Sequence, residues 1–127
     1  MDAPQIVAGL RGEARRTVTP ELTADAMGSG DVPVFATPAV LGLMEDAACH
    51  ALREALPEGV TSVGVWVELE HLAPSKVGAE VVAVAELLEA KGRTLEFACE
   101  ARDGDRVVAR ARHRRAIVDR ERFLGRL

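Results

Sequence analysis

Aromatic side chains are scarce in this 127-residue chain, which has three Phe, one Trp and no Tyr. Proteins that bind single-stranded nucleic acid stack bases on aromatic rings, and nucleic-acid-binding domains usually carry an excess of basic residues. Here 20 Asp and Glu outnumber 16 Lys and Arg, so the formal net charge is −4. We therefore expect no nucleic-acid partner.

Long apolar runs are also missing. A helix that crosses a bilayer needs about 20 consecutive apolar residues, and no stretch of the sequence approaches that length. The first ten residues, MDAPQIVAGL, have neither the basic start nor the extended apolar core of a secretory signal. These absences predict a cytoplasmic protein with no membrane partner.

Cysteine is limited to Cys49 and Cys99, which lie in separate periodic segments. Their spacing does not match a metal-binding motif, and His50 and His113 have no acidic or Cys partner at ligand spacing. We therefore expect no metal site and two reduced thiols that pack in the core. No basic residue near Cys49 in the sequence suggests the lowered thiol pKa of a nucleophile.

The length favours one domain, residues 1–127, and the sequence has no internal repeat or linker. A content of 48% hydrophobic and 28% charged residues is typical of a globular protein with one core. Residues 1–12 are weakly patterned, and we expect them to form a mobile arm.

The first half of the chain predicts one long helix. A short strand over residues 13–20 and a polar loop over 21–33 precede it. The helix is expected to begin near Thr37, because Thr is a good N-cap and Pro38 suits the first helical position. The segment LPEG at 56–59 should end it. Its apolar residues recur at helical spacing: Val40, Leu43, Met44, Ala47, Ala51 and Ala55.

The second half predicts strands joined by tight turns. Residues 79–90, 93–102 and 106–118 are separated by KG and DGD, which favour hairpins. One helix followed by an antiparallel sheet indicates an α+β fold in which the sheet wraps around the helix. The tail, 119–127, adds a helical turn.

Another strand is expected over residues 60–72, before these three. Alternation places one row of its side chains on the buried face, namely Val63, Val65, Val67, Leu69 and His71. It places another row on the opposite face, namely Gly64, Trp66, Glu68 and Glu70.

Three polar residues stand out against these patterns. Glu45 lies among apolar neighbours on the helix, where it either joins Asp46 on the solvated face or is buried with a compensating cation or hydrogen-bond donor. His71 ends the apolar strand row, either as a hydrogen-bonded structural group or facing a ligand. Thr37 is either a simple helix cap or part of a site. The residues alone leave these alternatives open.

The segments VFATPAVLGLMEDAA, GVWVELEHLAPSKVG and HRRAIVDRERF together resemble the hotdog-fold acyl-CoA thioesterases of the fluoroacetyl-CoA thioesterase type. The resemblance spans about residues 31–125. It implies that Thr37, Glu45 and His71 form the catalytic set, in which Glu45 follows Thr37 by eight positions and His71 follows Glu45 by 26. A family glycine seven residues before the histidine falls on Gly64.

The resemblance also implies quaternary structure and chemistry. It predicts a homodimer paired through its sheets, with the pocket near the subunit boundary and Glu45 facing a substrate tunnel; whether two dimers associate is left open. The expected reaction is hydrolysis of a small or medium acyl-CoA thioester, which is the substrate, with no cofactor. Glu45 either activates water as a general base or attacks the carbonyl to give a mixed anhydride. His71 would carry the proton, Thr37 would bond Glu45 or the carbonyl oxygen, and the N–H of Gly64 would stabilise the oxyanion.

The segment ARARHRR puts Arg110, Arg112 and Arg114 on one face of its strand. These arginines either form a solvated outer face or contact the phosphates of CoA, which a guanidinium binds in bidentate fashion. Arg112, Arg114 and Lys76, the last in the turn after His71, are the candidate phosphate ligands.

The resemblance weakens just before VFAT, where the family associates fluoroacyl selectivity with aromatic lid residues. Here residues 27–33, MGSGDVP, contain no aromatic, so we expect a pocket mouth that is more open or differently closed, and we do not extend fluorine selectivity to this chain; Phe35 is expected in the core. Two other functions compete. One is a different hotdog enzyme such as an enoyl-CoA hydratase, whose Asp/His motif is missing here, and the other is a non-catalytic acyl-CoA-binding module.

Overall fold

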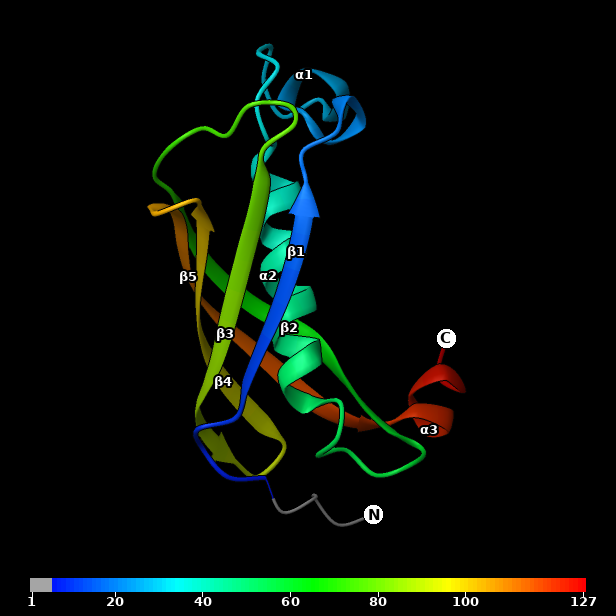
Figure 1. Ribbon diagram of the computed structural model, residues 1–127. Helices are drawn as coiled ribbons and strands as arrows, with labels where there is room; N and C mark the ends of the chain where they lie inside the picture. Colours follow the sequence, from blue (N-terminus) through cyan, green and yellow to red (C-terminus); the bar gives the residue numbers. More distant parts are fainter. Residues whose placement is uncertain (1–5) are drawn as a thin grey trace.

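The structure, a computed structural model, describes residues 6–127. Five strands form one antiparallel sheet in the order β1-β3-β4-β5-β2, which curls around the long helix α2 (Figure 1). The expected α+β architecture, with one helix inside a wrapped sheet, is confirmed. The strands are β1 (Arg11–Thr17), β2 (Val60–His71), β3 (Glu80–Lys91), β4 (Thr94–Asp103) and β5 (Arg106–Asp119).

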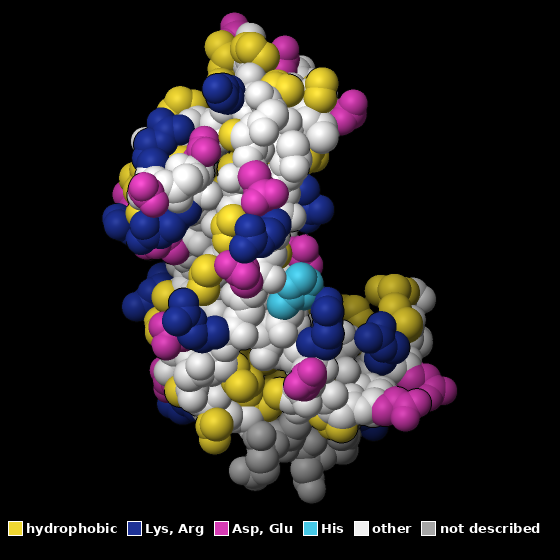
Figure 2. All heavy atoms as spheres, viewed as in Figure 1, with side chains coloured by type: hydrophobic (Ala, Val, Ile, Leu, Met, Phe, Trp, Pro, Cys, Tyr) yellow, Lys and Arg dark blue, Asp and Glu magenta, His cyan; other side chains and the backbone are white. Residues whose placement is uncertain are grey.

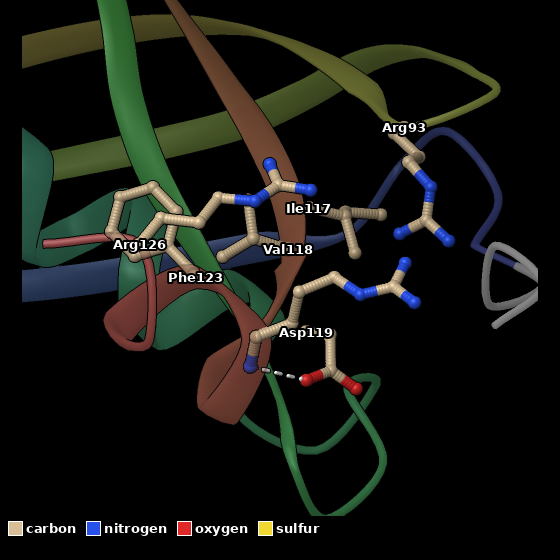
Figure 3. A pocket seen from close by; sticks show the side chains of 7 residues that line it. Arg93, Ile117, Val118, Asp119, Phe123 and Arg126 are labelled. Atoms are coloured by element: carbon tan, nitrogen blue, oxygen red, sulfur yellow. Dashed lines mark hydrogen bonds between the residues drawn. The ribbon is translucent and has the colours of Figure 1, made fainter.

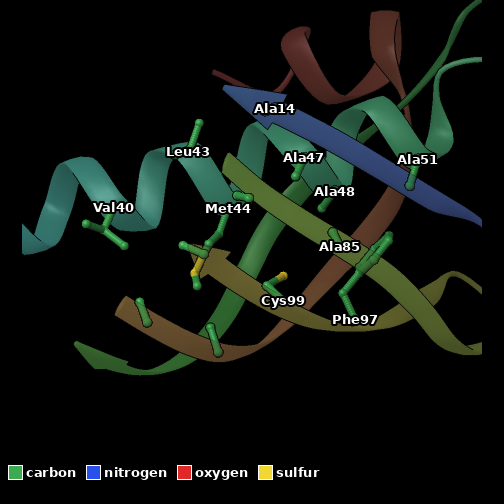
Figure 4. Packing of buried hydrophobic residues seen from close by; sticks show 14 of the residues in the cluster. Ala14, Val40, Leu43, Met44, Ala47, Ala48, Ala51, Ala85, Phe97 and Cys99 are labelled. Atoms are coloured by element: carbon green, nitrogen blue, oxygen red, sulfur yellow. The ribbon is translucent and has the colours of Figure 1, made fainter. Parts of the chain in front are cut away.

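Helix α2 spans Thr37–Leu52 and begins where the sequence predicts. Its N-cap, however, is Ala36, and Thr37 is the first helical residue, so the hydroxyl of Thr37 does not cap the helix. The helix also ends before the predicted stop at 56–59. In Figure 4, Met44 and Ala48 lie on the side of the helix that faces the strands. The buried residues of α2 are Val40, Leu43, Met44, Ala47, Ala48, Ala51 and Leu52.

Small residues let α2 lie close to β1. A Cβ added at Gly12 would clash with the carbonyl oxygen of Ala47 and the backbone N of Ala51. Ala14, two residues along β1, is buried against the same helix (Figure 4). Close packing of a helix on a strand therefore requires glycine at position 12.

The N-terminal part of the chain departs from the expected arm. Residues 1–5 lie outside the described residues, but Gly9 N–H donates to the carbonyl of Leu87 at 2.8 Å and β1 already begins at Arg11. The expectation of an arm up to residue 12 is therefore wrong for residues 9–12. Residues 21–33 are not wholly a loop, since they include most of a 3-10 turn, η1 (Pro20–Leu22), and a short helix, α1 (Ala24–Met27).

The C-terminal helix α3 (Arg120–Leu124) matches the expected turn and stands out from the body in Figure 1. In the same view, Figure 2 shows acidic and basic side chains interspersed over the surface. Within residues 6–127, no helix combines the length and apolarity needed to span a bilayer.

A β-bulge in β2 changes the predicted faces of this strand. The β2–β5 register shifts between Gly64 and Trp66, so Val65 is an extra residue in the ladder. Gly64 therefore pairs with Arg115, whose side chain points inward, and lies on the same inner face as His71. Strict alternation, which placed Gly64 and His71 on opposite faces, is wrong here.

The predicted burial of the β2 row is also wrong for the single chain. Val65 is 54% exposed and Val67 37% exposed. The reason is that β2 is an edge strand, paired only with β5, whereas α2 packs mainly on β1 and β3. This strand therefore has an unpaired, partly apolar edge.

Candidate functional site

The start of α2 and the end of β2 bring two predicted site residues together. Oγ1 of Thr37 lies 2.8 Å from Nδ1 of His71, a hydrogen bond in which either atom can donate. Nε2 of His71 is buried, and no described residue forms a hydrogen bond with it. Burial lowers the pKa of His71 from its ordinary value, which favours the neutral ring. The free nitrogen is therefore available to a ligand.

A pocket of about 310 Å³ opens at this pair. Its other lining residues come from the turn after β2 and from the segment between α1 and α2, including Ser29, Gly30, Asp31 and Val32. The segment in which the family resemblance expects lid aromatics thus borders the pocket, and it contributes none. Phe35 lines the inner wall and is only 1% exposed, as a core residue should be.

Glu45 lies over Gly64 on β2. A Cβ added at Gly64 would be 2.7 Å from Oε2 of Glu45, so the carboxylate fills the space that a side chain would need. The same oxygen lies 3.3 Å from Nη1 of Arg115, although 40% of the Glu45 side chain is exposed. Glu45 is therefore neither a solvated surface acid beside Asp46 nor fully buried. It is held from one side by a cation.

Two residues of this cluster, His113 and Arg115, were not predicted as part of the site. Both are buried on the inner face of β5, at 3% and 6% exposure. Nε of Arg115 donates to Oγ of Ser62 at 2.8 Å, and Nη2 donates to the carbonyl of Ser62 at 3.2 Å. The sequence did contain a signal, because these two polar residues occupy the strand face that otherwise carries Ala109, Ala111 and Ile117.

The hydrogen bonds of His113 define its protonation. Nδ1 lies 2.9 Å from the carbonyl oxygen of Trp66, which only accepts, so Nδ1 carries the proton. Nη1 of Arg115 lies 3.0 Å from Nε2, which must then be the acceptor. Burial, aided by the charge of Arg115, lowers the pKa of His113 despite the opposing effects of the Trp66 carbonyl and Glu45. His113 is therefore neutral, and its 3.7 Å approach to Glu45 is not an ion pair.

The structure forms two groups within one chain. Thr37 meets His71, and Glu45 meets Gly64 and Arg115. Thr37 and Glu45 are eight residues apart on α2, or roughly 12 Å along the helix axis. Within residues 6–127, no hydrogen bond or ion pair joins Glu45 to His71. The four predicted positions therefore do not converge in a single chain.

The candidate phosphate ligands are divided between locations. Lys76 is exposed, and its backbone pairs with Val34 beside the Thr37–His71 pocket. Arg112 and Arg114 lie on the outer face of the sheet, at a separate hollow of about 440 Å³. Arg114 is also engaged there, since Nε lies 2.8 Å from Glu96 and the guanidinium lies 4.9 Å from the Trp66 ring centre.

The two cysteines differ in environment. Cys49 is exposed, so the expectation that it packs in the core is wrong, whereas Cys99 is buried on β4 (Figure 4). Burial, with a smaller effect of Glu45, raises the pKa of Cys99 to about 12, so the group stays a thiol. Within residues 6–127, no three or more His, Cys, Asp or Glu side chains gather as metal ligands.

A further hollow lies beside α3, away from the predicted catalytic residues. Its lining includes Arg93, Arg122, Arg126 and Phe123, and Figure 3 shows Arg93, Phe123 and Arg126 around it. Its volume is about 190 Å³, and the carboxylate of Asp119 at its rim accepts the N-terminal hydrogen bond of the helix from the N–H of Arg122. None of the predicted site residues lines this hollow.

Comparisons with known proteins find relatives in both sequence and structure. The fluoroacetyl-CoA thioesterase of Streptantibioticus cattleyicolor is 36% identical over 90 residues, which are 71% of this chain and 65% of that relative, just under two thirds of its length. A solved structure of FlK, a serine-for-threonine variant in complex with acetyl-CoA, is 28% identical with a TM-score of 0.88 and covers 95% of this chain and 96% of that one. A thioesterase superfamily member from Thermus thermophilus, TTHA0967, is 28% identical with a TM-score of 0.87. The aligned residues are 95% of this chain and 90% of that one.

A family model described as fluoroacetyl-CoA-specific thioesterase matches residues 18–121. That range contains α2, the complete sheet except β1, and both groups of site residues. The chain therefore belongs to the fluoroacetyl-CoA-specific thioesterase family.

Proposed function

We propose that this protein hydrolyses a small or medium acyl-CoA thioester to the free acid and CoA. The observation that carries the proposal is the Thr37–His71 hydrogen bond at the mouth of a pocket of about 310 Å³, with a buried ring nitrogen left without a described partner. Membership of a thioesterase family supports it, as does a relative that binds acetyl-CoA. Among residues 6–127, no acidic side chain pairs with His71, so the imidazole is free to transfer a proton.

The second half of the site is supplied by a second copy of the chain. The free edge of β2 exposes its unpaired backbone groups together with Val65 and Val67, which favours pairing with an equivalent edge. Antiparallel pairing centred on Glu68, with Val65 left as the extra residue of the bulge, would set His71 of one copy opposite Gly64 of the other. Because the bulge puts both residues on the inner face, this register joins the Thr37–His71 pair to Glu45 of the second copy.

In this composite site each group has one task. Glu45 removes a proton from water, whose oxygen adds to the thioester carbonyl, or its carboxylate adds directly and water then opens the anhydride. The N–H of Gly64 donates to the oxyanion of the tetrahedral intermediate. In the first route the neutral His71 receives from Glu45 the proton taken from water and passes it to the sulfur of CoA as the C–S bond breaks. In the anhydride route it takes the proton from the water that opens the anhydride and passes it to the CoA thiolate released in the first step. The hydroxyl of Thr37 holds the imidazole in place. Transfer of ¹⁸O from labelled water into Glu45 during a single turnover distinguishes the anhydride route.

The substrate is expected to be broader than a fluoroacyl group, because the segment at residues 27–33 brings no aromatic ring to the pocket. Lys76 is our candidate for contact with the CoA phosphates, since its backbone pairs with Val34, which lines this pocket. Lys76→Ala should then raise KM for CoA esters without raising it for N-acetylcysteamine thioesters. Two unpaired cysteines agree with a cytoplasmic location.

The test is a thiol-release assay with acetyl-, fluoroacetyl-, branched, aromatic and long-chain CoA esters. We expect CoA release with at least one short or medium ester, and a loss of about 10²- to 10⁴-fold in Glu45→Gln. Disappearance of an enoyl-CoA without thiol release would indicate a hydratase. Stabilisation by acyl-CoA without any turnover would indicate a binding module.

A further inference from the structure

We propose that Arg115 is a positioning residue, which fixes the carboxylate of Glu45 for catalysis through a rigid network on the inner face of β5. This inference rests on the proposed role of Glu45. It goes beyond that role because it concerns a residue outside the predicted catalytic set. Arg115 contacts Glu45 with one nitrogen and is itself held by three other hydrogen bonds.

The guanidinium has little freedom to move. On β2, both Nε and Nη2 donate to Ser62, to its hydroxyl at 2.8 Å and its carbonyl at 3.2 Å. On β5, Nη1 donates to Nε2 of His113 at 3.0 Å. These contacts fix the plane of the guanidinium, and the side chain is only 7% exposed. The same Nη1 lies 3.3 Å from Oε2 of Glu45.

His113 completes this network as a neutral acceptor. Its Nδ1 proton is committed to the carbonyl of Trp66, so Nε2 presents a lone pair to Arg115. Phe97 lies against the ring, with centroids 6.5 Å apart, and limits its rotation. A protonated His113 would instead repel the guanidinium. The lowered pKa of His113 is therefore in keeping with this arrangement.

Glu45 needs such a fixed partner. Its side chain is flexible and 40% exposed, so the helix alone does not determine where the carboxylate points. The groups that face it from other elements are Arg115 and His113 on β5 and the thiol of Cys99 on β4. Arg115 is the only cation among these three, and the absence of a Cβ at Gly64 leaves room for the carboxylate to reach it.

A lysine could not replace this arginine. Nε and Nη2 both donate to Ser62, while Nη1 reaches both Oε2 of Glu45 and Nε2 of His113. An ammonium on a flexible stem supplies charge but not the planar fork. Arg115→Lys is therefore expected to recover only part of the activity that Arg115→Met loses.

The experiment measures kcat and KM for acyl-CoA hydrolysis in Arg115→Met, Arg115→Lys and Ser62→Ala. Arg110→Met is the matched control, because Arg110 lies on the same strand, on the outer face, paired with Glu100 at 3.5 Å. We expect kcat to fall by about 10- to 100-fold in Arg115→Met, by less in the other two variants, and KM to stay within about twofold. The control should match the wild type.

A double mutant separates positioning from a general structural effect. If Arg115 acts through Glu45, Arg115→Met should cost no further activity in a Glu45→Gln background. An additional loss as large as in the wild-type background, or a wild-type kcat in folded Arg115→Met, would overturn the inference. If Arg115→Met does not fold, reduced kcat at constant KM in Arg115→Lys and Ser62→Ala supports it, and wild-type kcat in both overturns it. A fully active Glu45→Gln would instead mean that the proposed function of Glu45 has failed.

Discussion

The carboxylate of Glu45 occupies the place of a side chain at Gly64, because a Cβ on that glycine would lie 2.7 Å from Oε2. The contact joins the middle of α2 to the bulged part of β2. Glycine is therefore needed at position 64 to leave room for the carboxylate of Glu45. It is not needed for the backbone conformation, since Gly64 is not among the glycines with positive φ.

Gly64→Ala should therefore reduce activity more than stability. The added methyl group lies 3.2 Å from the ring of buried His113, but its tightest contact is with the end of the flexible, partly exposed Glu45 side chain. Its main effect should therefore be to move the carboxylate that we propose is catalytic. We expect kcat/KM to fall by about 100-fold, the loss typical when a misplaced group reduces proximity. Thermal unfolding and thiol release on the same sample check this. A variant with normal activity would show that the position of Glu45 over Gly64 is not used in catalysis.

Gly12→Ala should behave in the opposite way. Here the methyl group would meet the backbone of Ala47 and Ala51, which cannot move without separating α2 from β1. We expect a loss of about 1–3 kcal/mol or more in the free energy of unfolding. Urea denaturation measures it, with Gly42→Ala as the control because no atom lies within 4 Å of a Cβ there. Equal stability of the two variants would contradict the close helix–strand packing.

Thr37→Val removes the hydroxyl that bonds His71 but keeps the shape of the side chain. Loss of a hydrogen bond of this kind should lower kcat/KM by about 2- to 10-fold. Thr37→Ser, which keeps the hydroxyl, should lose less, and neither should unfold the protein because Ala36, not Thr37, is the N-cap of the helix. Steady-state kinetics and circular dichroism distinguish this from a capping role, for which the Val variant would mainly lose stability.

Acidification should destabilise the protein through its buried histidines. The pKa of His113 and that of His71 are both lowered on folding, so the unfolded chain takes up protons at a higher pH than the folded chain does. The free energy of unfolding should therefore fall as the pH drops through about 6.5, the ordinary histidine value. Urea denaturation between about pH 7.5 and 5.5 measures the slope.

His113→Gln is the control for that slope. The amide of Gln can donate and accept a hydrogen bond but does not titrate, so part of the pH dependence should disappear while the contribution of His71 remains. An unchanged slope would mean that His113 is not buried in its neutral form.

Local patterns in the sequence predicted most of the fold. The start of α2 at Thr37 follows from Pro38, and the strands follow from alternation and from turns such as Asp103–Gly104, because these signals act over a few residues. The bulge at Val65 was not predictable from alternation, since it depends on how β2 pairs with β5. Its consequence is large, because it moves Gly64 to the inner face.

The site was predicted in part. The resemblance identified Thr37, and the structure places it against His71, whereas capping alone would have been a sufficient reason for this residue. His113 and Arg115 were passed over, although two polar residues on an otherwise apolar strand face indicate a buried network. Their link to Glu45 joins residues far apart in the sequence, so no local pattern could reveal it.

In the proposed dimer, Glu45 of one copy and His71 of the other form one catalytic site. The test is to mix Glu45→Gln and His71→Gln homodimers, each inactive alone, and let their subunits exchange. Random exchange makes about half of the dimers mixed, each with one intact site, so about one quarter of the wild-type activity should return. If the exchanged mixture stays inactive, the two residues do not act across subunits and the composite site is wrong.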